Sequence, residues 1–251
     1  MSTQDASAGM AGLSERAEES YSAYLAGRLF NQHEITGNVL LKEAVWRKSK
    51  GRFNLVLPQS KELRQLEIPD LSAYLRNEDL HQVVKADIFI ALFDGSDVDS
   101  GTVVEFMLAK MLGKPSVIIR TDSRHLGTSG LDDPYNLMLK NWPRTQEVNI
   151  DSLIDYTRKI AEARQTFEDS DSESLLLEAE LAIVRTGIDE LAVSLIEALN
   201  IVIGMESPYP PALQEAVYQA VRYTPGAGFD QLLTEDQLNA IMQRLTQYHT
   251  L

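Results

Sequence analysis

Residues 86–105 read ADIFIALFDGSDVDSGTVVE and combine a strand, an acidic turn and the beginning of a helix. The run over 86–93 is almost continuously apolar and rich in Ile and Phe, which predicts a strand buried on both faces. Thr102–Leu112 then places apolar residues at helical spacing, and Gly113 ends this helix. Glu105 is therefore expected in the first turns of a helix that follows a strand.

This position of Glu105 is typical of a residue that contacts a bound ligand. Open α/β sheets bind their ligands at the carboxyl ends of the strands. A carboxylate near the positive end of a helix is favoured in its charged form. Three more carboxylates lie in the preceding turn, those of Asp94, Asp97 and Asp99. An ionised and positioned glutamate in such surroundings can act as a nucleophile.

Strands and helices alternate through the first two thirds of the chain. Strands are expected at Ser22–Ala26, Asn54–Leu57, 86–93 and Pro115–Arg120, and helices at Asn38–Lys48, Leu71–Lys85, Thr102–Leu112, Pro134–Asn141 and Ile150–Phe167. This alternation predicts an α/β fold, with a Rossmann-like or flavodoxin-like parallel sheet covered by helices on both faces. Gly27–Glu34 is expected to be a loop. Gly27 alone does not make a G-x-G-x-x-G fingerprint, so a dinucleotide cofactor is not expected.

Charge divides the chain into parts. From Glu168 onward there are 14 acidic and three basic residues, so this part carries −11 of the formal net charge of −14. We expect a flexible N-terminal arm at 1–20, an α/β domain at 21–167 and an acidic helical C-terminal extension at 168–251. The extension is expected to form helices over Leu175–Leu199 and Ala212–Tyr223, and a last one after the N-cap Thr234. It shows no catalytic cluster, so it is expected to pack against the core or to mediate oligomerisation.

Composition excludes several kinds of function. The 251 residues include no cysteine, which rules out disulfides, thiol catalysis and cysteine-ligated metals. The four histidines lack metal-ligand spacing, so neither a metal nor an organic cofactor is expected. The negative charge argues against a nucleic acid partner. No run has membrane-spanning length and no secretory leader is seen, so a cytoplasmic protein without a membrane partner is expected.

Several short segments, taken together in order, resemble the nucleoside 2-deoxyribosyltransferase family. They are Tyr24-Leu-Ala-Gly-Arg-Leu-Phe30, Asn77-Glu-Asp-Leu80, Ala86-Asp-Ile88, Asp94-Gly95, Asp99-Ser-Gly-Thr-Val-Val-Glu105, Gly113-Lys-Pro115 and Asn136-Leu-Met138. Each segment alone is weak evidence, whereas the ordered set is specific. The resemblance covers roughly residues 22–165 and leaves out the N-terminal arm and the acidic extension.

The resemblance implies an enzyme that transfers 2-deoxyribose between the nucleobases of 2′-deoxynucleosides. Glu105 is then the nucleophile, which attacks C1′ and forms a covalent 2-deoxyribosyl ester while the base leaves. A second free base attacks from the opposite face, so the β configuration is retained. The oxocarbenium-like transition state is cationic, and surrounding carboxylates stabilise it.

Three further residues match catalytic positions of the family. The resemblance implies that Asp99 faces the base and takes part in its protonation, because the base is a poor leaving group unless a ring nitrogen is protonated. Asp79 then orients the sugar or the nucleophile, and the Tyr24 hydroxyl reaches Glu105 or the sugar. The alternatives are an N-cap for Asp99, a helix-surface carboxylate for Asp79 and an ordinary buried aromatic for Tyr24.

Three other residues match substrate-binding positions. Gly27 is expected to let the backbone approach the ligand closely, and Phe30 to stack on the base. Gln59 is placed like a family residue that hydrogen-bonds the edge of the base. The alternative for Gln59 is a plain turn residue.

Asn136 and Met138 resemble residues that a neighbouring subunit contributes to the pocket, with Asn136 reaching the 5′-hydroxyl of the sugar. The resemblance thus implies a homo-oligomer in which these residues complete a neighbour's site. The alternative is that Leu137 and Met138 belong to the core while Asn136 caps a turn.

Two other functions stay open. One is hydrolysis of the N-glycosidic bond in (deoxy)nucleoside 5′-monophosphates through the same glutamate. In such related sequences the loop after the first strand is rich in Ser and Arg, whereas here it supplies a single cation, Arg28. The other is a non-catalytic nucleotide-binding module, favoured only by the acidic extension.

Overall fold

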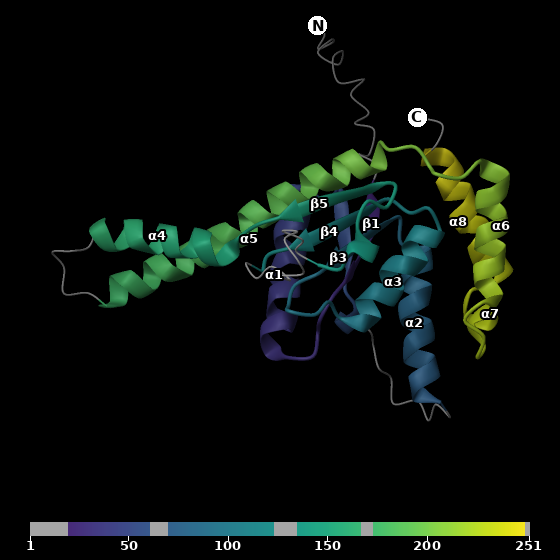
Figure 1. Cartoon of the computed structure of the whole chain (residues 1–251), viewed down its shortest axis with the longest axis horizontal. Helices are drawn as coiled ribbons and strands as arrows, with labels where there is room; N and C mark the ends of the chain where they lie inside the picture. Colours follow the sequence, from purple (N-terminus) through teal and green to yellow (C-terminus); the bar gives the residue numbers. More distant parts are fainter. Residues whose placement is uncertain (1–19, 61–69, 123–134, 167–172, 249–251) are drawn as a thin grey trace, which may run out of the picture.

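The structure, a computed structural model, describes residues 20–60, 70–122, 135–166 and 173–248. The arm expected at 1–20 therefore lies outside the described residues, apart from Ser20. The centre is a five-stranded parallel sheet with the strand order β2-β1-β3-β4-β5 (Figure 1). Its strands are β1 (Tyr21–Ala26), β2 (Phe53–Val56), β3 (Ile88–Leu92), β4 (Ser116–Arg120) and β5 (Thr145–Asn149).

The strand order is the flavodoxin-like one of the two α/β arrangements expected from the sequence. The fold-class prediction is thus confirmed. Because β1 pairs with both β2 and β3, the order reverses between β1 and β3. Parallel α/β sheets bind ligands outside the carboxyl ends of the strands at such a reversal.

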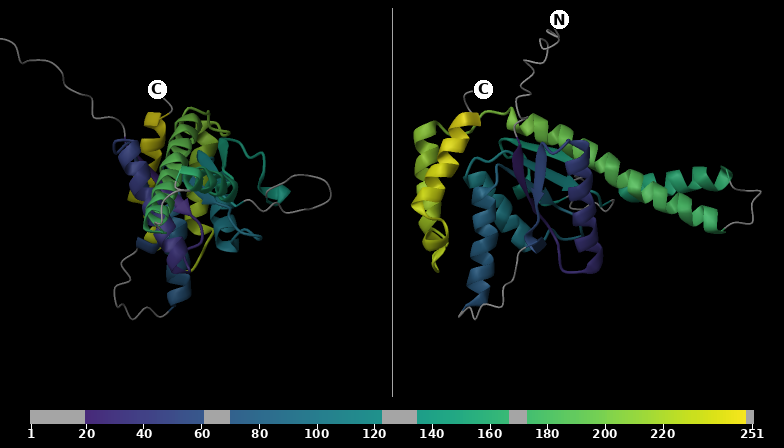
Figure 2. Two further views of the ribbon diagram at one scale, coloured as in Figure 1. Left: turned by 90° about the vertical axis from the view of Figure 1, so that its left-hand side faces the viewer. Right: turned by 180° about the vertical axis from the view of Figure 1, so that it is seen from behind.

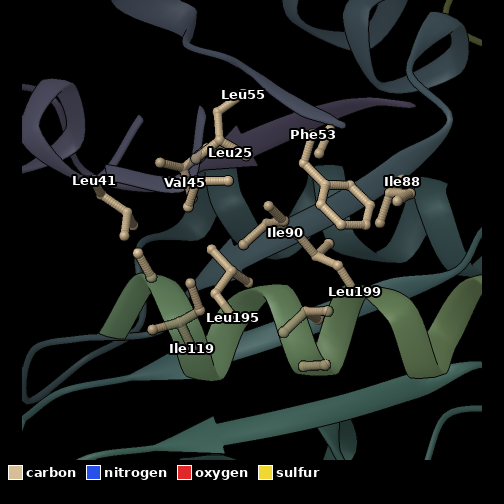
Figure 3. Packing of buried hydrophobic residues seen from close by; sticks show 14 of the residues in the cluster. Leu25, Leu41, Val45, Phe53, Leu55, Ile88, Ile90, Ile119, Leu195 and Leu199 are labelled. Atoms are coloured by element: carbon tan, nitrogen blue, oxygen red, sulfur yellow. The ribbon is translucent and has the colours of Figure 1, made fainter. Parts of the chain in front are cut away.

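Two helices cover one face of the sheet, α1 (Gln32–Lys48) and α5 (Glu173–Ile203). Leu195 and Leu199 of α5 pack with Ile90 and Ile119 of the sheet, as Figure 3 shows. The apolar side of α5 therefore completes the hydrophobic core. The C-terminal extension packs against the core, as expected, and its predicted boundary near residue 168 falls outside the described residues.

The other face carries α2 (Leu71–Lys85) and α3 (Ser100–Met111). Phe89, Phe93 and Phe106 form the centre of this second cluster, with the ring of Phe106 5.5 Å from that of Phe93. Alternate residues of β3 contribute to the two faces, so this strand is buried on both sides, as its apolar run predicts.

Three C-terminal helices form an outer layer on α2, and they are α6 (Pro211–Tyr223), α7 (Phe229–Leu232) and α8 (Glu235–Tyr248) (Figures 1 and 2). Leu80 and Val84 of α2 pack with Tyr218 and Phe229 of this layer. The Asn77 side chain adds a hydrogen bond of 2.9 Å to the Ala227 carbonyl. The layer is thus attached to the helix that carries Asp79.

Thr234 caps the last helix, as the sequence predicts. Its hydroxyl accepts a hydrogen bond from the Gln237 backbone, and the Gln237 side chain accepts one from the Thr234 backbone. These reciprocal bonds satisfy two donors at the start of α8.

The remaining helix, α4 (Ser152–Thr166), lies against the first half of α5, and the pair extends beyond the sheet (Figure 1). Lys159 of α4 forms an ion pair with Glu190 of α5. Asp189 of α5 is paired with Arg47 and Lys48 at the end of α1. These contacts join the helical pair to the α/β core.

Two local predictions differ from the structure. α1 begins at Gln32 rather than at Asn38, because Asn31 and Glu34 form a capping box that starts the helix earlier. The helix expected at Pro134–Asn141 is a single 3-10 turn, η2 (Leu137–Leu139), and Pro134 lies outside the described residues.

Within the described ranges, none of the helices combines the length and the apolar character needed to cross a membrane. The same part of the chain contains no group of three or more His, Asp or Glu residues placed to hold a metal ion.

Candidate active site

Tyr24 lies at the centre of the candidate site. It belongs to β1, its side chain points to the face covered by α2 and α3, and it is completely buried. Its hydroxyl donates a hydrogen bond of 2.8 Å to Glu105 Oε1 and lies 3.3 Å from Asp79 Oδ1. A phenol has one proton, so it donates to one of these carboxylates at a time.

The cap of α3 sets the position of Glu105. Asp99 Oδ2 accepts hydrogen bonds from the backbone N–H and the hydroxyl of Thr102, at 2.9 and 3.0 Å. Gly101 leaves room for this carboxylate, since a Cβ there would lie 3.1 Å from Asp99 Oδ2. Asp99 is thus an N-cap, as the alternative reading held, and its cap places the half-buried Glu105 in the second turn.

The other carboxylate comes from α2. Asp70 caps this helix by accepting a hydrogen bond from the Ala73 backbone at 2.9 Å. Asp79 lies in the middle of the helix and is half-buried. The two carboxylates thus reach the Tyr24 hydroxyl from two neighbouring helices.

The electrostatics keep Tyr24 in its protonated form. Burial raises the pKa of its hydroxyl far above the usual range, and the negative charges of Glu105 and Asp79 raise it further. A phenol that stays neutral remains a hydrogen-bond donor at every physiological pH. Tyr24 can therefore orient the Glu105 carboxylate without competing with it as a nucleophile.

Asp94 and Asp97 do not join this cluster. Asp94 accepts hydrogen bonds from the Thr121 backbone and hydroxyl, at 2.6 and 2.7 Å, and from the Asp122 backbone at 3.1 Å. It therefore joins the carboxyl ends of β3 and β4. Asp97 is exposed, and its carbonyl accepts a hydrogen bond from Arg28.

Gly27 permits a close approach within the sheet. A Cβ at this position would lie 3.0 Å from the Cβ of Leu92 at the end of β3. The neighbouring Arg28 donates to the Asp97 carbonyl at 3.0 Å, and its guanidinium lies beside Gly95. Arg28 lines a cavity of about 400 Å³ together with residues of α1 and α5, which is on the opposite face of the sheet from Tyr24.

Gln59 follows β2 and uses both ends of its amide within the protein. Its Oε1 accepts from Asn38 at 3.2 Å, and its Nε2 donates to the Ile35 carbonyl at 3.2 Å. Asn38 also donates to the Arg28 carbonyl at 3.1 Å. The buried Asn38, which sequence reasoning missed, thus joins the loop after β1 to the turn after β2.

Phe30, Asn136 and Met138 lie on the surface. Phe30 is 78% exposed and Met138 is 77% exposed. Asn136 caps η2 by accepting a hydrogen bond from the Met138 backbone at 2.9 Å. Leu137 and Met138 are therefore not core residues, so that part of the alternative reading was wrong, whereas the turn cap is present.

Of the nine expected site residues, the structure brings Tyr24, Asp79 and Glu105 into direct contact through one hydroxyl. The others surround the carboxyl edge on separate loops. Three supporting residues were missed, namely Asn31, Asn38 and Gly101. The capping pattern of Asn31 with Glu34 was the signal for the first of them.

Residues 23–138 match the sequence model of the nucleoside 2-deoxyribosyltransferase family. This part of the chain is similar to that family, as its ordered segments implied. The matched range contains all nine expected site residues and ends at Met138. It excludes α4 to α8, so the family match accounts for β1 to β4 and not for the C-terminal helices.

Comparison with curated protein sequences gave no match. Among solved structures, a conserved protein from Enterococcus faecalis V583 is similar, with a TM-score of 0.45, 24% identity and coverage of 54% of this chain and 94% of that one. A 2-deoxyribosyltransferase from Bacillus psychrosaccharolyticus gives a TM-score of 0.38 at 24% identity, over 48% and 81% of the two chains. A CMP N-glycosidase from Clostridium botulinum gives 0.35 at 18% identity, over 56% and 98%. Similarity at this level carries no argument about activity.

Proposed function

We propose that this protein transfers 2-deoxyribose between the nucleobases of 2′-deoxynucleosides. The observation that carries the proposal is the hydrogen bond from the buried Tyr24 to Glu105, inside the part of the chain that matches the family model. This bond fixes a carboxylate oxygen beside the point where the strand order reverses. A nucleophile held in this way needs no further activation by a metal.

In the first step, one Glu105 oxygen attacks C1′ of the donor nucleoside. The bond from C1′ to the base nitrogen breaks, its electron pair stays with the base, and a 2-deoxyribosyl ester forms on Glu105. In the second step, a nitrogen of the acceptor base attacks C1′ from the opposite face and releases the carboxylate. Two inversions leave the product with the β configuration of the donor.

Tyr24 and Asp79 support this chemistry in different ways. The Tyr24 hydroxyl orients Glu105 by donating a hydrogen bond to it. When Glu105 becomes a neutral ester, the hydroxyl can donate to Asp79 instead, because both carboxylates lie within its reach. Asp79 contributes a negative charge next to a cationic transition state. Asp79 therefore acts chiefly in positioning and electrostatic stabilisation.

We assign protonation of the leaving base to Asp99. Oδ2 of this residue serves the helix cap, and Oδ1 makes no hydrogen bond within the described part of the chain. Oδ1 is therefore the atom that would face the base. The same residue then has two tasks, fixing the start of α3 and assisting the departure of the base.

The position of Arg28 favours nucleosides over nucleoside monophosphates. Arg28 is the single cation of the loop after β1, and its guanidinium is held beside Gly95 and the Asp97 carbonyl. It lines the cavity on the α1 and α5 face rather than the face of Tyr24. A hydrolase that acts on 5′-monophosphates would need a phosphate-binding cation on the same face of the sheet as Glu105, where C5′ of the sugar would lie.

We further propose that a second copy of the chain completes the site. Asn136 and Met138 are exposed, and Leu137 between them is also exposed. Exposed apolar residues beside a polar cap form a surface suited to association. In the assembly, Asn136 and Met138 would contact the sugar bound by the neighbouring subunit.

Base exchange is tested by chromatography. The wild type and Glu105→Ala are incubated with 2′-deoxyinosine and adenine, and separately with 2′-deoxyuridine and adenine. We expect the wild type alone to form 2′-deoxyadenosine, also in the presence of EDTA. Release of free base without a new nucleoside would support the hydrolase instead, and no reaction from any donor would contradict an enzymatic function.

A further inference from the structure

A cavity of about 490 Å³ lies at the amino edge of the sheet, opposite to the edge of the candidate active site. Tyr21 and Ile88, the first residues of β1 and β3, form part of its wall. The other wall comes from Ile203 at the end of α5, from Met205 just after that helix, and from Leu245 of α8. The volume of the cavity lies in the range of small-molecule sites. Its walls come both from the α/β domain and from the C-terminal helices.

Two arginines line this amino-edge cavity, Arg52 and Arg144. Arg52 directly precedes β2 and Arg144 directly precedes β5, the two edge strands of the sheet. Four strand spacings separate these positions, about 19 Å between the backbones. The Arg52 guanidinium lies over the rings of β1 and β2 residues, whereas that of Arg144 lies at the Gly113 carbonyl before β4, so the two groups enter the cavity from different sides.

Neither arginine has an anionic partner in the described part of the chain. The Arg52 guanidinium lies over the rings of Tyr21 and Phe53, 5.7 Å from each centroid, and within the described residues its side chain forms no ion pair or hydrogen bond. Arg144 donates to the Gly113 carbonyl at 2.9 Å, while its buried Nε has no hydrogen-bond partner in the part of the chain that the structure describes. Both arginines are half-buried, each with a buried Nε that has no hydrogen-bond partner among the described residues, so each could accept an anionic partner.

The carboxylates in the wall do not supply this anionic partner. Asp87 is only 7% exposed and accepts hydrogen bonds from the backbone and the hydroxyl of Ser22, both at 2.7 Å. It also pairs with Arg244 at 2.7 Å, which compensates its charge. Glu206 is exposed and forms no hydrogen bond or ion pair with other described residues.

The surroundings of Arg144 are also positive. The Lys110 ammonium donates to the Arg144 carbonyl at 3.3 Å, and the fully buried Lys114 donates to the Ala86 carbonyl at 2.6 Å. Burial lowers the pKa of each lysine to about 7, and the charge of Arg144 contributes to both shifts. Four basic side chains, those of Arg52, Arg144, Lys110 and Lys114, thus gather at this edge of a chain whose formal net charge is −14.

The backbone conformation of Arg144 is one that does not favour arginine, so another reason is needed for this residue type. Its φ of 51° lies in the left-handed region, which glycine adopts more easily than arginine. A turn of this shape does not need arginine for its conformation. The residue is explained better by its position in the cavity.

We propose that the amino-edge cavity binds a small organic molecule that carries a phosphate group at each end. One phosphate contacts Arg52 and the other contacts Arg144. Guanidinium groups recognise phosphate through paired hydrogen bonds, and each phosphate supplies between one and two negative charges. The separation of the arginines selects a ligand with two distant anionic groups over inorganic phosphate. This site is independent of the deoxyribose transfer proposed above.

The test is calorimetric titration of the full chain at constant ionic strength. The probes are fructose 1,6-bisphosphate and, as the matched monophosphate, fructose 6-phosphate. We expect the bisphosphate to bind at least tenfold more tightly than the monophosphate. Arg52→Gln should remove this difference, whereas Arg185→Gln, at an exposed arginine of α5, and Glu105→Gln should leave both affinities unchanged.

Three results would overturn the proposal. They are the absence of binding by either probe, equal affinities for the two probes in the wild type, and bisphosphate affinity that survives Arg52→Gln. Arg144→Gln should weaken bisphosphate binding in the same way, but this residue also supports the Gly113 carbonyl. If that variant does not fold, Arg52→Gln decides the outcome, because the Arg52 side chain forms no hydrogen bond with other described residues.

Discussion

The Tyr24 hydroxyl lies 2.8 Å from Glu105 Oε1, although 81 residues separate the two in the chain. The bond joins the middle of β1 to the second turn of α3, across the point where the strand order reverses. Through this bond, a residue of the sheet positions the proposed nucleophile on the neighbouring helix. The predictions below follow from this bond and from the contacts that support it.

Tyr24→Phe should lower kcat/KM for base exchange about 10- to 100-fold. It removes one hydrogen bond to a charged group, which is worth about 1.5–3 kcal/mol. Steady-state kinetics measure the effect. Tyr218→Phe is the matched control, because it deletes another buried hydroxyl that makes no hydrogen bond among the described residues, and it should leave activity unchanged. Wild-type activity in Tyr24→Phe would show that the bond does not position the nucleophile.

Two substitutions at Asp99 separate its structural task from its chemical one. Asparagine is as good an N-cap as aspartate, so Asp99→Asn should keep the stability of the protein and lose most of its activity. Asp99→Ala should in addition lower the free energy of unfolding by about 1 kcal/mol, because the cap is lost. Urea denaturation and base-exchange assays distinguish these effects. An active Asp99→Asn would assign the acid to another residue.

Gly27→Ala and Gly37→Ala should have opposite effects on stability. A Cβ at Gly27 would lie 3.0 Å from Leu92, so overpacking should cost about 1–3 kcal/mol. A Cβ at Gly37 meets no atom of the described residues within 4 Å and lies inside α1, where alanine is favoured by up to about 1 kcal/mol. Thermal unfolding of both variants gives the comparison. Equal stability of Gly27→Ala and the wild type would mean that the ends of β1 and β3 can separate freely.

Lys114 should make stability depend on pH. Burial is the main cause that lowers its pKa to about 7 in the folded protein, below the usual value of 10.5. Between these values the unfolded chain binds more protons, so the contribution of Lys114 to stability rises from pH 7 to about pH 10. The free energy of unfolding of the wild type should therefore increase relative to that of Lys114→Met, by up to about 1 kcal/mol per pH unit. A constant difference across this range would indicate that Lys114 stays charged when buried.

Subunit complementation tests the shared site. Asn136→Ala and Glu105→Ala should each have little activity alone, because in an oligomer of one variant every active site lacks the substituted side chain. A mixture of the two, unfolded and refolded together, should regain activity from sites that combine the intact Glu105 of one subunit with Asn136 of the other. Sedimentation analysis should show an oligomer for all samples. A monomeric wild type with full activity would refute the shared site.

The sequence predicted the central elements because their signals are local. α2 has the bounds expected from its apolar spacing, Leu71–Lys85, and the apolar run at 86–93 contains β3. The contact of Tyr24 with Glu105 was expected from the family resemblance, not from spacing. Such a contact depends on how distant elements pack, which the pattern of one segment does not contain.

Other features depend on tertiary context. β5 (Thr145–Asn149) was missed because it is an edge strand with a single buried residue, Val148, and so has no apolar run. The apolar side of α5 was visible in the sequence, but its place on the sheet was not. Asn38 is buried within a helix and bridges two loops, a role that helical spacing does not reveal.

The most direct test of the account is mass analysis of the covalent intermediate. The wild type is mixed with 2′-deoxyinosine without an acceptor base, quenched in acid and digested. The account predicts that the peptide containing Glu105 gains the mass of one 2-deoxyribosyl group, and that this gain disappears when adenine is added before the quench. An active wild type that exchanges bases without this adduct, or with the adduct on another residue, would contradict the assignment of Glu105 as the nucleophile.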